Sequence, residues 1–312
     1  MGKRIEEIDY LRCIFISLMI IFHLAYIGDK YPYLKSIVYT FHMSGFLVIS
    51  GFLANSNKDI FSFLKMITFV FIPYAIMEAG YVIMSSVLPI REHIDLLSPL
   101  ILVEKIFISP MGPYWYLHTL ILSWIVWYFL NNIFRRATKK LILHSILLPI
   151  CFYVLSGLGL ISFDNAIYFI FGILIKLSGI NFTAVFQPTK FSFLPLAALC
   201  CFPDNLNRGS FWGIVITYLS ICFFLSIYPF LSFRIKKITT FIGRNTLVLL
   251  LFSPIFTFLS KPLVFIFSFD PSGIAFASIA TLVTILGSFG IAWIMDLTGF
   301  SKYFFGRKKN LI

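Results

Sequence analysis

The amino-terminal apolar segment contains an arginine and a histidine, residue types that can bind an anion and transfer a proton. Arg12 lies near the start of the segment, and His23 follows eleven positions later. A helix turns by roughly 100° per residue, so this spacing places both side chains on one face, about 16 Å apart along the axis. The structural alternatives are snorkelling of Arg12 to lipid headgroups and a hydrogen bond from His23 to a neighbouring helix.

Three more ionisable residues lie inside the next apolar segments. They are His42 in TFHMSGFLVISGFLAN, Glu78 after Ile72-Pro73-Tyr74, and His118 in PYWYLHTL. Ionisable groups are costly in a membrane and usually serve a function, although each could instead make a structural hydrogen bond. Because these residues and His23 fall in the middle or outer half of their segments, we expect them to line one cavity open to a polar substrate.

Aromatic and small residues accompany these groups. Trp115 and Tyr116 would suit stacking on a sugar ring, with an interfacial aromatic belt as the alternative. The small residues of the second segment are expected to permit close contact between helices: Ser44, Gly45, Ser50 and Gly51.

The composition predicts that these side chains are positioned by membrane-spanning helices. Of 312 residues, 59% are hydrophobic and only 12% are charged, far below the usual quarter for soluble domains. Several apolar runs approach or exceed the roughly 20 residues needed to cross a bilayer. We therefore predict an all-α, polytopic membrane helix bundle forming one domain over residues 1–312. About ten spans are expected: 10–27, 35–54, 62–89, 113–130, 141–159, 164–178, 191–203, 210–231, 241–260 and 273–296.

The distribution of basic residues predicts the orientation. If both termini are cytoplasmic, 19 of the 25 Lys and Arg residues fall in inner segments, as the positive-inside rule requires. The inner set includes Lys3 and Arg4, and the outer set is Lys30, Lys35, Arg91, Lys105, Arg208 and Lys261. This asymmetry explains the net charge of +12 without a nucleic-acid partner.

The sequence does not favour a metal site. It contains no HExxH motif and no i, i+4 histidine pair, and its five cysteines lack CxxC spacing. Walker, GxGxxG and GxSxG motifs are also absent.

Four segments, in order, resemble those of the membrane-bound acyltransferase-3 family. The most specific is the arginine, ten intervening residues and a histidine from Arg12 to His23. The others are FHMSGFLVISGFL, PYWYLHTL and FIGRNTLVLLLFS. The resemblance covers most of the chain, and it departs from the family pattern at Ser44, where a proline is usual, and at Ser253-Pro254, where a histidine often occurs.

The resemblance implies transfer of an acyl group, usually acetyl, from cytoplasmic acetyl-CoA to a hydroxyl. The acceptor would be a surface polysaccharide, such as lipopolysaccharide, or its lipid-linked precursor, at the bacterial inner membrane. His23 would be the general base or a transient acyl carrier, and Arg12, Arg244 and Asn245 would contact coenzyme A phosphate. Glu78, His118 and His42 would complete the catalytic set.

Rival interpretations remain open from the sequence. Another acyl group, such as succinyl, fits the same chemistry. A transporter of a saccharide or lipid-linked sugar would also need a polar cavity, but the chain shows no internal repeat. A purely structural membrane subunit would not account for four ionisable groups at similar depth.

Overall fold

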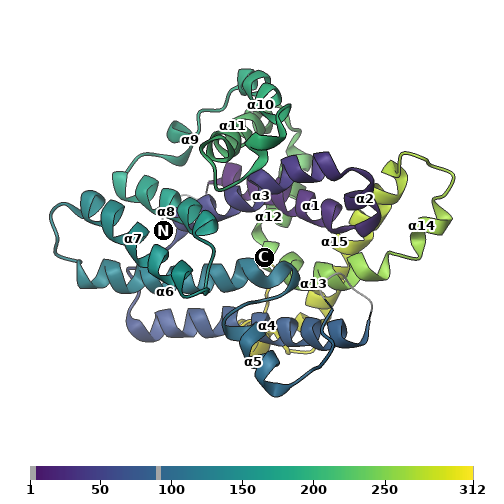
Figure 1. Ribbon diagram of the computed structural model, residues 1–312, viewed down its shortest axis with the longest axis horizontal. Helices are drawn as coiled ribbons and strands as arrows, with labels where there is room; N and C mark the ends of the chain where they lie inside the picture. Colours follow the sequence, from purple (N-terminus) through teal and green to yellow (C-terminus); the bar gives the residue numbers. More distant parts are fainter. Residues whose placement is uncertain (1–4, 89–92, 312) are drawn as a thin grey trace. The chain divides into compact units, whose positions relative to one another are not determined.

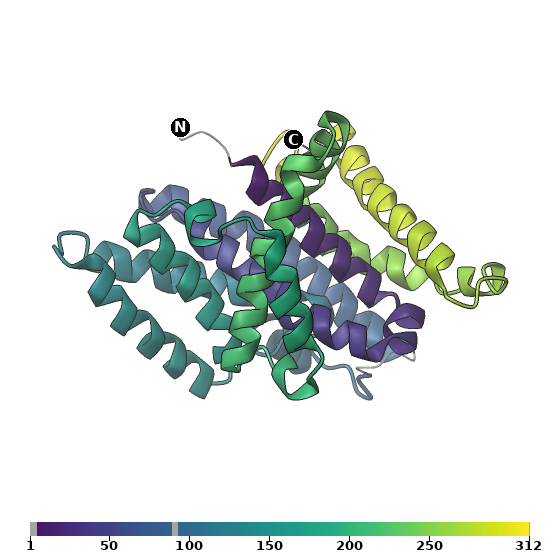
Figure 2. The same cartoon turned by 90° about the horizontal axis from the view of Figure 1, so that it is seen from above.

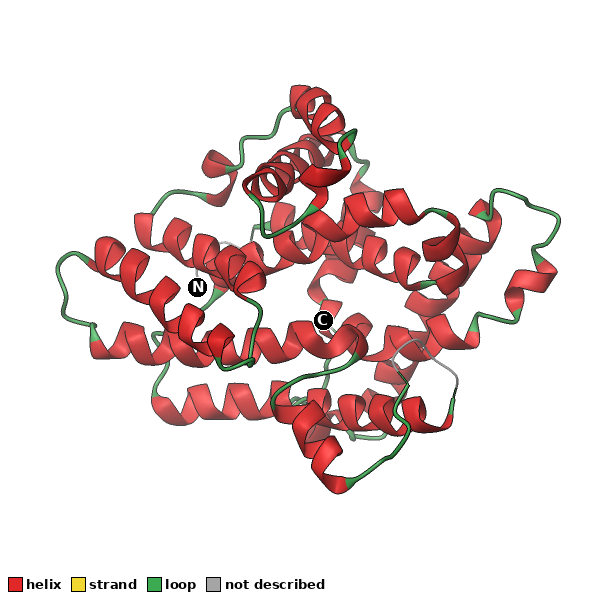
Figure 3. Cartoon of the chain, viewed as in Figure 1, coloured by secondary structure: helices red, strands yellow, loops and turns green. Residues whose placement is uncertain are grey.

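The computed structural model describes residues 5–88 and 93–311, and every regular element within these ranges is a helix (Figure 1, Figure 3). The prediction of an all-helical chain is confirmed. Lys3, Arg4 and Arg91, which the charge argument counts, lie outside the described residues. The first half contains α1 (Glu6–His23), α2 (Ala25–Lys30), α3 (Pro32–Leu53), α4 (Ile60–Val87), α5 (Pro99–Phe107), η1 (Gly112–Tyr114), α6 (Trp115–Ile133) and α7 (Lys140–Gly157). The second half contains α8 (Phe163–Ser178), α9 (Phe182–Val185), η2 (Lys190–Ser192), α10 (Phe193–Cys200), η3 (Pro203–Leu206), α11 (Phe211–Ile227), η4 (Tyr228–Phe230), α12 (Phe233–Arg244), α13 (Thr246–Leu259), α14 (Leu263–Ile266), α15 (Ile274–Leu297) and α16 (Ser301–Phe304).

Several of these helices are long and apolar enough to cross a membrane. Among the described residues, five meet both criteria: Pro32–Leu53, Ile60–Val87, Lys140–Gly157, Phe211–Phe230 and Ile274–Leu297. The pair α12 and α13, bent by 81°, would make a sixth. The chain is thus a multi-pass membrane protein by length and composition, while the count of ten spans and the cytoplasmic termini stay predictions.

The segment predicted to span at 191–203 differs most from expectation. Its helical run, η2 followed directly by α10, covers only Lys190–Cys200. At 1.5–2 Å per residue such a run is about 16–22 Å long, well short of the roughly 30 Å of hydrocarbon. Pro195 is the third residue of α10, within its first turn.

The chain divides into two compact units, each built from distant parts of the sequence. One contains Met1–Phe46, Phe182–Lys302 and Arg307–Ile312; the other contains Leu47–Asn181 and Tyr303–Gly306. In the first unit, α1 packs against α11, α12, α13 and α15, and α13 packs against α15 (Figure 1). The short α10 lies beside α11 (Figure 2). Helix α1 is therefore the central element of its unit.

In the second unit, α4 packs against α5 and α6, and α7 packs against α8. The end of α3 approaches α8 at backbone distance, because a Cβ atom on Gly51 would lie 2.2 Å from the carbonyl oxygen of Phe169. In the first unit, Gly45 similarly accommodates the ring of Phe15, which a Cβ would meet at 2.4 Å. The predicted role of both glycines in close helix contact is confirmed.

Candidate functional site

Arg12 and His23 belong to one uninterrupted helix. Helix α1 runs from Glu6 to His23, so the two residues lie eleven positions apart on the same helix, as predicted. Their spacing corresponds to about 16 Å along the axis, with both side chains on one face. The helix ends at His23, where Leu24 leaves the helical conformation.

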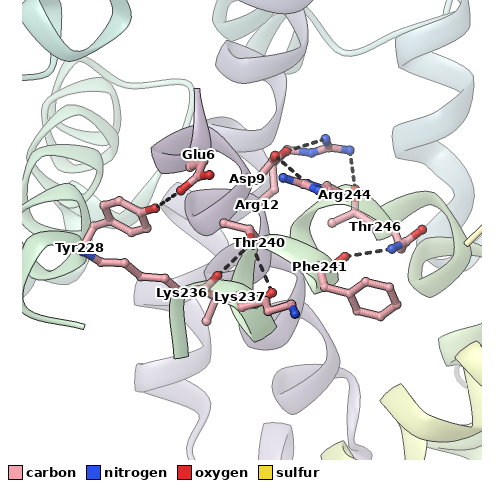
Figure 4. A network of polar contacts seen from close by, with 12 residues as sticks. Glu6, Asp9, Arg12, Tyr228, Lys236, Lys237, Thr240, Phe241, Arg244 and Thr246 are labelled. Carbon is pink, nitrogen blue, oxygen red and sulfur yellow. Dashed lines mark hydrogen bonds and ion pairs between the residues drawn. The ribbon is translucent and has the colours of Figure 1, made fainter. Parts of the chain in front are cut away.

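A cluster of charged side chains surrounds Arg12, and we call it the arginine cluster: Asp9, Arg12, Arg244 and Thr246 (Figure 4). Arg12 Nη1 lies 3.6 Å from a carboxylate oxygen of Asp9, and Arg244 Nε lies 3.5 Å from the other. Arg12 Nη2 also donates a hydrogen bond to the Thr246 hydroxyl at 2.6 Å. Asp9 is buried, whereas both arginines remain partly exposed. One carboxylate thus holds two guanidinium groups together.

The packing of α1 on α12 brings these residues together. A Cβ atom on Gly243 would lie only 1.7 Å from the carbonyl oxygen of Asp9, so the two backbones touch at this glycine. Directly afterwards the chain bends by 81° at Asn245, between α12 and α13. Asn245 is buried, and its side-chain amide donates to the carbonyl oxygen of Phe241 at 2.9 Å. The predicted Arg244–Asn245 pair therefore lies at a helix break beside Arg12.

Further polar contacts extend along α12 from the arginine cluster. The Tyr228 hydroxyl donates to Glu6 at 2.9 Å, and the Lys236 ammonium lies 4.8 Å from the centre of the Tyr228 ring. Formally, the arginine cluster carries two positive charges and one negative charge. Guanidinium groups present planar donors that match phosphate, so this end of α1 is suited to bind an anion.

At the other end of α1, a hydrogen bond defines the tautomer of His23. Nδ1 lies 2.7 Å from the carbonyl oxygen of Met19. Since a carbonyl oxygen can only accept, Nδ1 carries the hydrogen, and in the neutral ring Nε2 has the lone pair. Nε2 makes no hydrogen bond to the described residues. His23 is half-buried, and its Nε2, the basic atom, lies on the side of the ring away from its own helix backbone.

Tyr39 places the two predicted histidines of this unit in one row. Its ring stacks on His23 with centroids 5.9 Å apart, and it lies 5.2 Å from the ring of His42. His42 is buried, and its Nδ1–H donates to the carbonyl oxygen of Val38 at 2.7 Å. Its Nε2 has no hydrogen-bond partner among the described residues. The structure therefore brings His23 and His42 together, separated by one tyrosine.

Glu78 and His118 both belong to the second unit and contact backbone there. Glu78 is fully buried and accepts a hydrogen bond from the Met111 amide at 2.6 Å. His118 Nε2–H donates to the carbonyl oxygen of Phe107 at 3.0 Å. These bonds tie α4 to Met111, directly before η1, and α6 to the end of α5. A structural hydrogen bond is the alternative considered for Glu78.

The predicted sugar-stacking pair also lies in the second unit. Trp115 and Tyr116 begin α6, with ring centroids 6.2 Å apart in an edge-to-face arrangement. The Tyr116 hydroxyl and the Ser50 hydroxyl are 2.8 Å apart. Tyr116 is buried and Trp115 is partly exposed, so of the two Trp115 has the more accessible ring. The predicted common cavity would need residues of both units: His23, His42, Glu78 and His118. That cavity stays a prediction.

Three residues of the first unit were missed by the sequence reasoning. Asp9 holds the two arginines, Gly243 permits their approach, and Tyr39 links the histidines. Asp9 precedes Arg12 by one helical turn, a spacing that favours an ion pair and could have indicated its role. Nothing in the local sequence around Gly243 or Tyr39 identifies a partner that is distant in the chain.

Within residues 5–88 and 93–311, no three His, Cys, Asp or Glu side chains gather as a metal site would require.

A family model described as an acyltransferase domain, acyltransferase-3, matches residues 5–293. No match was found among curated proteins or among solved structures. The matched region includes every residue assigned above to the arginine cluster and to the histidine row.

Proposed function

The chain belongs to the acyltransferase-3 family, and we propose that it is a membrane O-acyltransferase that uses acetyl-CoA. The acceptor in this proposal is a hydroxyl of a cell-surface polysaccharide or of its lipid-linked precursor, at the inner membrane of a bacterium. The single observation that carries the proposal is the architecture of α1. Near one end, Arg12 and Asp9 of α1 meet Arg244 in the arginine cluster, and at the other end His23 has an available Nε2.

The arginine cluster would bind the donor. Acetyl-CoA carries its phosphates at one end and its thioester at the end of a long flexible arm. Arg12 and Arg244 offer charge-assisted hydrogen bonds to phosphate, and Asp9 keeps the two guanidinium groups near each other. A phosphate at this cluster would leave the arm free to extend along α1 toward His23. The basic residues of α12 agree with an inner, cytoplasmic location of this end.

His23 would act as the general base. Its Nε2 takes the proton of the acceptor hydroxyl as the oxygen attacks the thioester carbonyl carbon. The new carbon–oxygen bond forms, the carbon–sulfur bond breaks, and the departing thiolate receives the proton from the imidazolium. The hydrogen bond to Met19 fixes the ring orientation and the tautomer throughout. His42, Glu78 and His118 remain proposed members of the catalytic set, with Trp115 and Tyr116 proposed to contact the sugar.

The test compares the glycan of cells that differ only in this residue. A strain lacking the gene is complemented with the wild type, His23→Ala or His23→Asn, and surface polysaccharide is examined by NMR for O-acetyl signals. The Asn variant retains an N–H group that can donate to Met19 but has no base. We expect O-acetyl signals with the wild type and their loss with both variants at equal protein level.

A matched control is His93→Ala, because His93 lies in a loop and is half-exposed. This control should retain acetylation. Unchanged acetylation in the His23→Asn strain would contradict the assignment of the base. Absence of any acyl signal in the complemented wild-type strain, with export of glycan restored, would favour a transporter instead.

A further inference from the structure

A pocket of about 660 Å³ lies in the first unit, close to the histidine row. One wall comes from the end of α2, with Gly28 and Asp29, and from the first turns of α3, including Lys35 and Tyr39. The opposite wall is the segment from Leu206 to Arg208, which precedes α11. We call it the Lys35–Arg208 pocket.

The lining of this pocket is polar and carries net positive charge. Lys35 and Arg208 contribute two cations, and Asp29 contributes the one carboxylate among the lining residues. Both cations belong to the six that the charge distribution predicts on the outer side. A lining with a net positive charge favours an anionic ligand over a neutral one.

Specific contacts hold the backbone at Arg208 and place the Lys35 ammonium. The Thr40 hydroxyl donates to the carbonyl oxygen of Leu206 at 2.8 Å, which holds the Leu206–Arg208 segment on α3. Gly213 lets the same segment approach α11, because a Cβ there would lie 2.7 Å from the Cα atom of Arg208. The Lys35 ammonium lies 5.3 Å from the centre of the Tyr39 ring. The pocket is therefore held by contacts from both α3 and α11.

Tyr39 connects the pocket to the proposed base. The same ring that lies under the Lys35 ammonium stacks on His23, with centroids 5.9 Å apart. A ligand in the pocket would thus be one tyrosine ring away from His23. This is the placement that the acceptor needs, since the proposed donor cluster lies about 16 Å away at the other end of α1.

We propose that the Lys35–Arg208 pocket binds the acyl acceptor through an anionic group, a phosphate or a carboxylate on the saccharide. The proposal rests on the function proposed above. Lys35 and Arg208 donate charge-assisted hydrogen bonds to the anion, and this contact positions a nearby hydroxyl of the same saccharide for His23. The acceptor is therefore an acidic or phosphate-linked saccharide rather than a neutral one.

The experiment uses the purified full-length protein in nanodiscs of zwitterionic phosphatidylcholine. The probes are an oligosaccharide of galacturonic acid, its carboxyl-reduced counterpart and glucose 1-phosphate. Binding and acetyl transfer from acetyl-CoA are measured for the wild type, Lys35→Gln, Arg208→Gln and Arg208→Lys. The matched control is Lys261→Gln, which removes another predicted outer cation whose contact is the ring of Phe258, 4.6 Å away.

We expect the wild type to bind at least one anionic probe more tightly than the carboxyl-reduced oligosaccharide. Lys35→Gln and Arg208→Gln each remove one charge-assisted contact, so each should weaken binding of the anionic probe and raise the KM for that probe by about tenfold. The KM for acetyl-CoA should be unchanged. Arg208→Lys should recover part of the affinity, and Lys261→Gln should match the wild type. Equal binding of acidic and reduced oligosaccharides by the wild type would overturn the proposal. So would a failure to bind any anionic probe.

Two further arms separate related outcomes. Repeating the binding in nanodiscs with anionic phosphatidylglycerol tests a lipid headgroup as the occupant. If Lys35→Gln and Arg208→Gln change only the dependence on anionic lipid, the acceptor assignment is wrong. Anion binding that depends on Arg208 without any thioester consumption would instead refute the proposed acyltransferase activity and leave the pocket assignment standing.

Discussion

The contact between Gly243 and Asp9 gives the sharpest prediction for the arginine cluster. In the substitution Gly243→Ala, the new Cβ would lie 1.7 Å from the carbonyl oxygen of Asp9, whereas ordinary van der Waals contact begins at 3.4 Å. Helices α1 and α12 would therefore have to separate by more than about 1 Å, since neither backbone can rotate away as a side chain can. The substitution should both destabilise the protein and disperse the cluster.

The magnitude follows from the contacts that the separation breaks. Overpacking of this kind costs about 1–3 kcal/mol. The hydrogen bond from Arg12 to Thr246, now 2.6 Å long, would be lost for about 1 kcal/mol more. The ion pairs of Asp9, at 3.5 and 3.6 Å, would exceed 4 Å. We expect the free energy of unfolding to fall by about 2–4 kcal/mol, and acetyl-CoA to bind about tenfold more weakly.

The assay is SDS-induced unfolding followed by tryptophan fluorescence, with acetyl-CoA affinity measured by calorimetry on the same samples. Gly290→Ala is the matched control, because Gly290 lies within α15 and a Cβ there would meet no atom within 4 Å. Replacing a helical glycine by alanine in open space should stabilise the protein by about 0.5–1 kcal/mol. If Gly243→Ala proves as stable as Gly290→Ala and binds acetyl-CoA like the wild type, the reasoning is refuted.

Two other sites give direct predictions. Gly51→Ala and Gly172→Ala should each lower the free energy of unfolding by about 1–3 kcal/mol, because their Cβ atoms would lie 2.2 and 2.1 Å from carbonyl oxygens of the facing helix. The double variant should lower the free energy of unfolding by less than the sum of the two single effects, because both glycines lie where α3 and α8 cross. Fully additive effects would argue against this shared contact. Asp270 accepts hydrogen bonds from the Ser272 hydroxyl and the Ala275 amide, which hold the pKa of its carboxyl below 3.8. The ionised Asp270 carboxyl therefore stabilises the folded protein above pH 3.8, and this stabilisation is lost as pH falls through the lowered pKa. The difference in melting temperature between wild type and Asp270→Asn should shrink in acid. A difference that does not depend on pH would contradict this.

The sequence predicted the class of the molecule and the content of its first helix. Local properties sufficed for this, because apolar length predicts a membrane helix and helical periodicity predicts which residues of α1 share a face. The Arg12–His23 spacing in one helix is confirmed for that reason. Segment 191–203 shows the limit of the same reasoning, since apolar content does not determine that α10 ends after eight residues.

The sequence did not predict contacts between segments that are distant in the chain. Arg12 and Thr246 are 234 positions apart, and only tertiary packing brings them within hydrogen-bond distance. The break at Asn245 was predicted only as the inner start of a span, not as a bend of 81°. In the sequence, Tyr39 is one of many aromatic residues in apolar segments. Only the structure shows that its ring stacks on His23.

The most direct test of the proposed function is the release of free coenzyme A by the purified protein. Wild-type protein and the His23→Asn variant are reconstituted in nanodiscs with acetyl-CoA and a galacturonic acid oligosaccharide, and thiol release is followed together with O-acetyl formation on the saccharide. We predict that the wild type produces thiol and O-acetyl groups in equal amounts, and that the variant produces neither while still binding acetyl-CoA. Equal rates of transfer in both proteins would contradict the role of His23, and the absence of thiol release from the wild type would contradict the proposed activity itself.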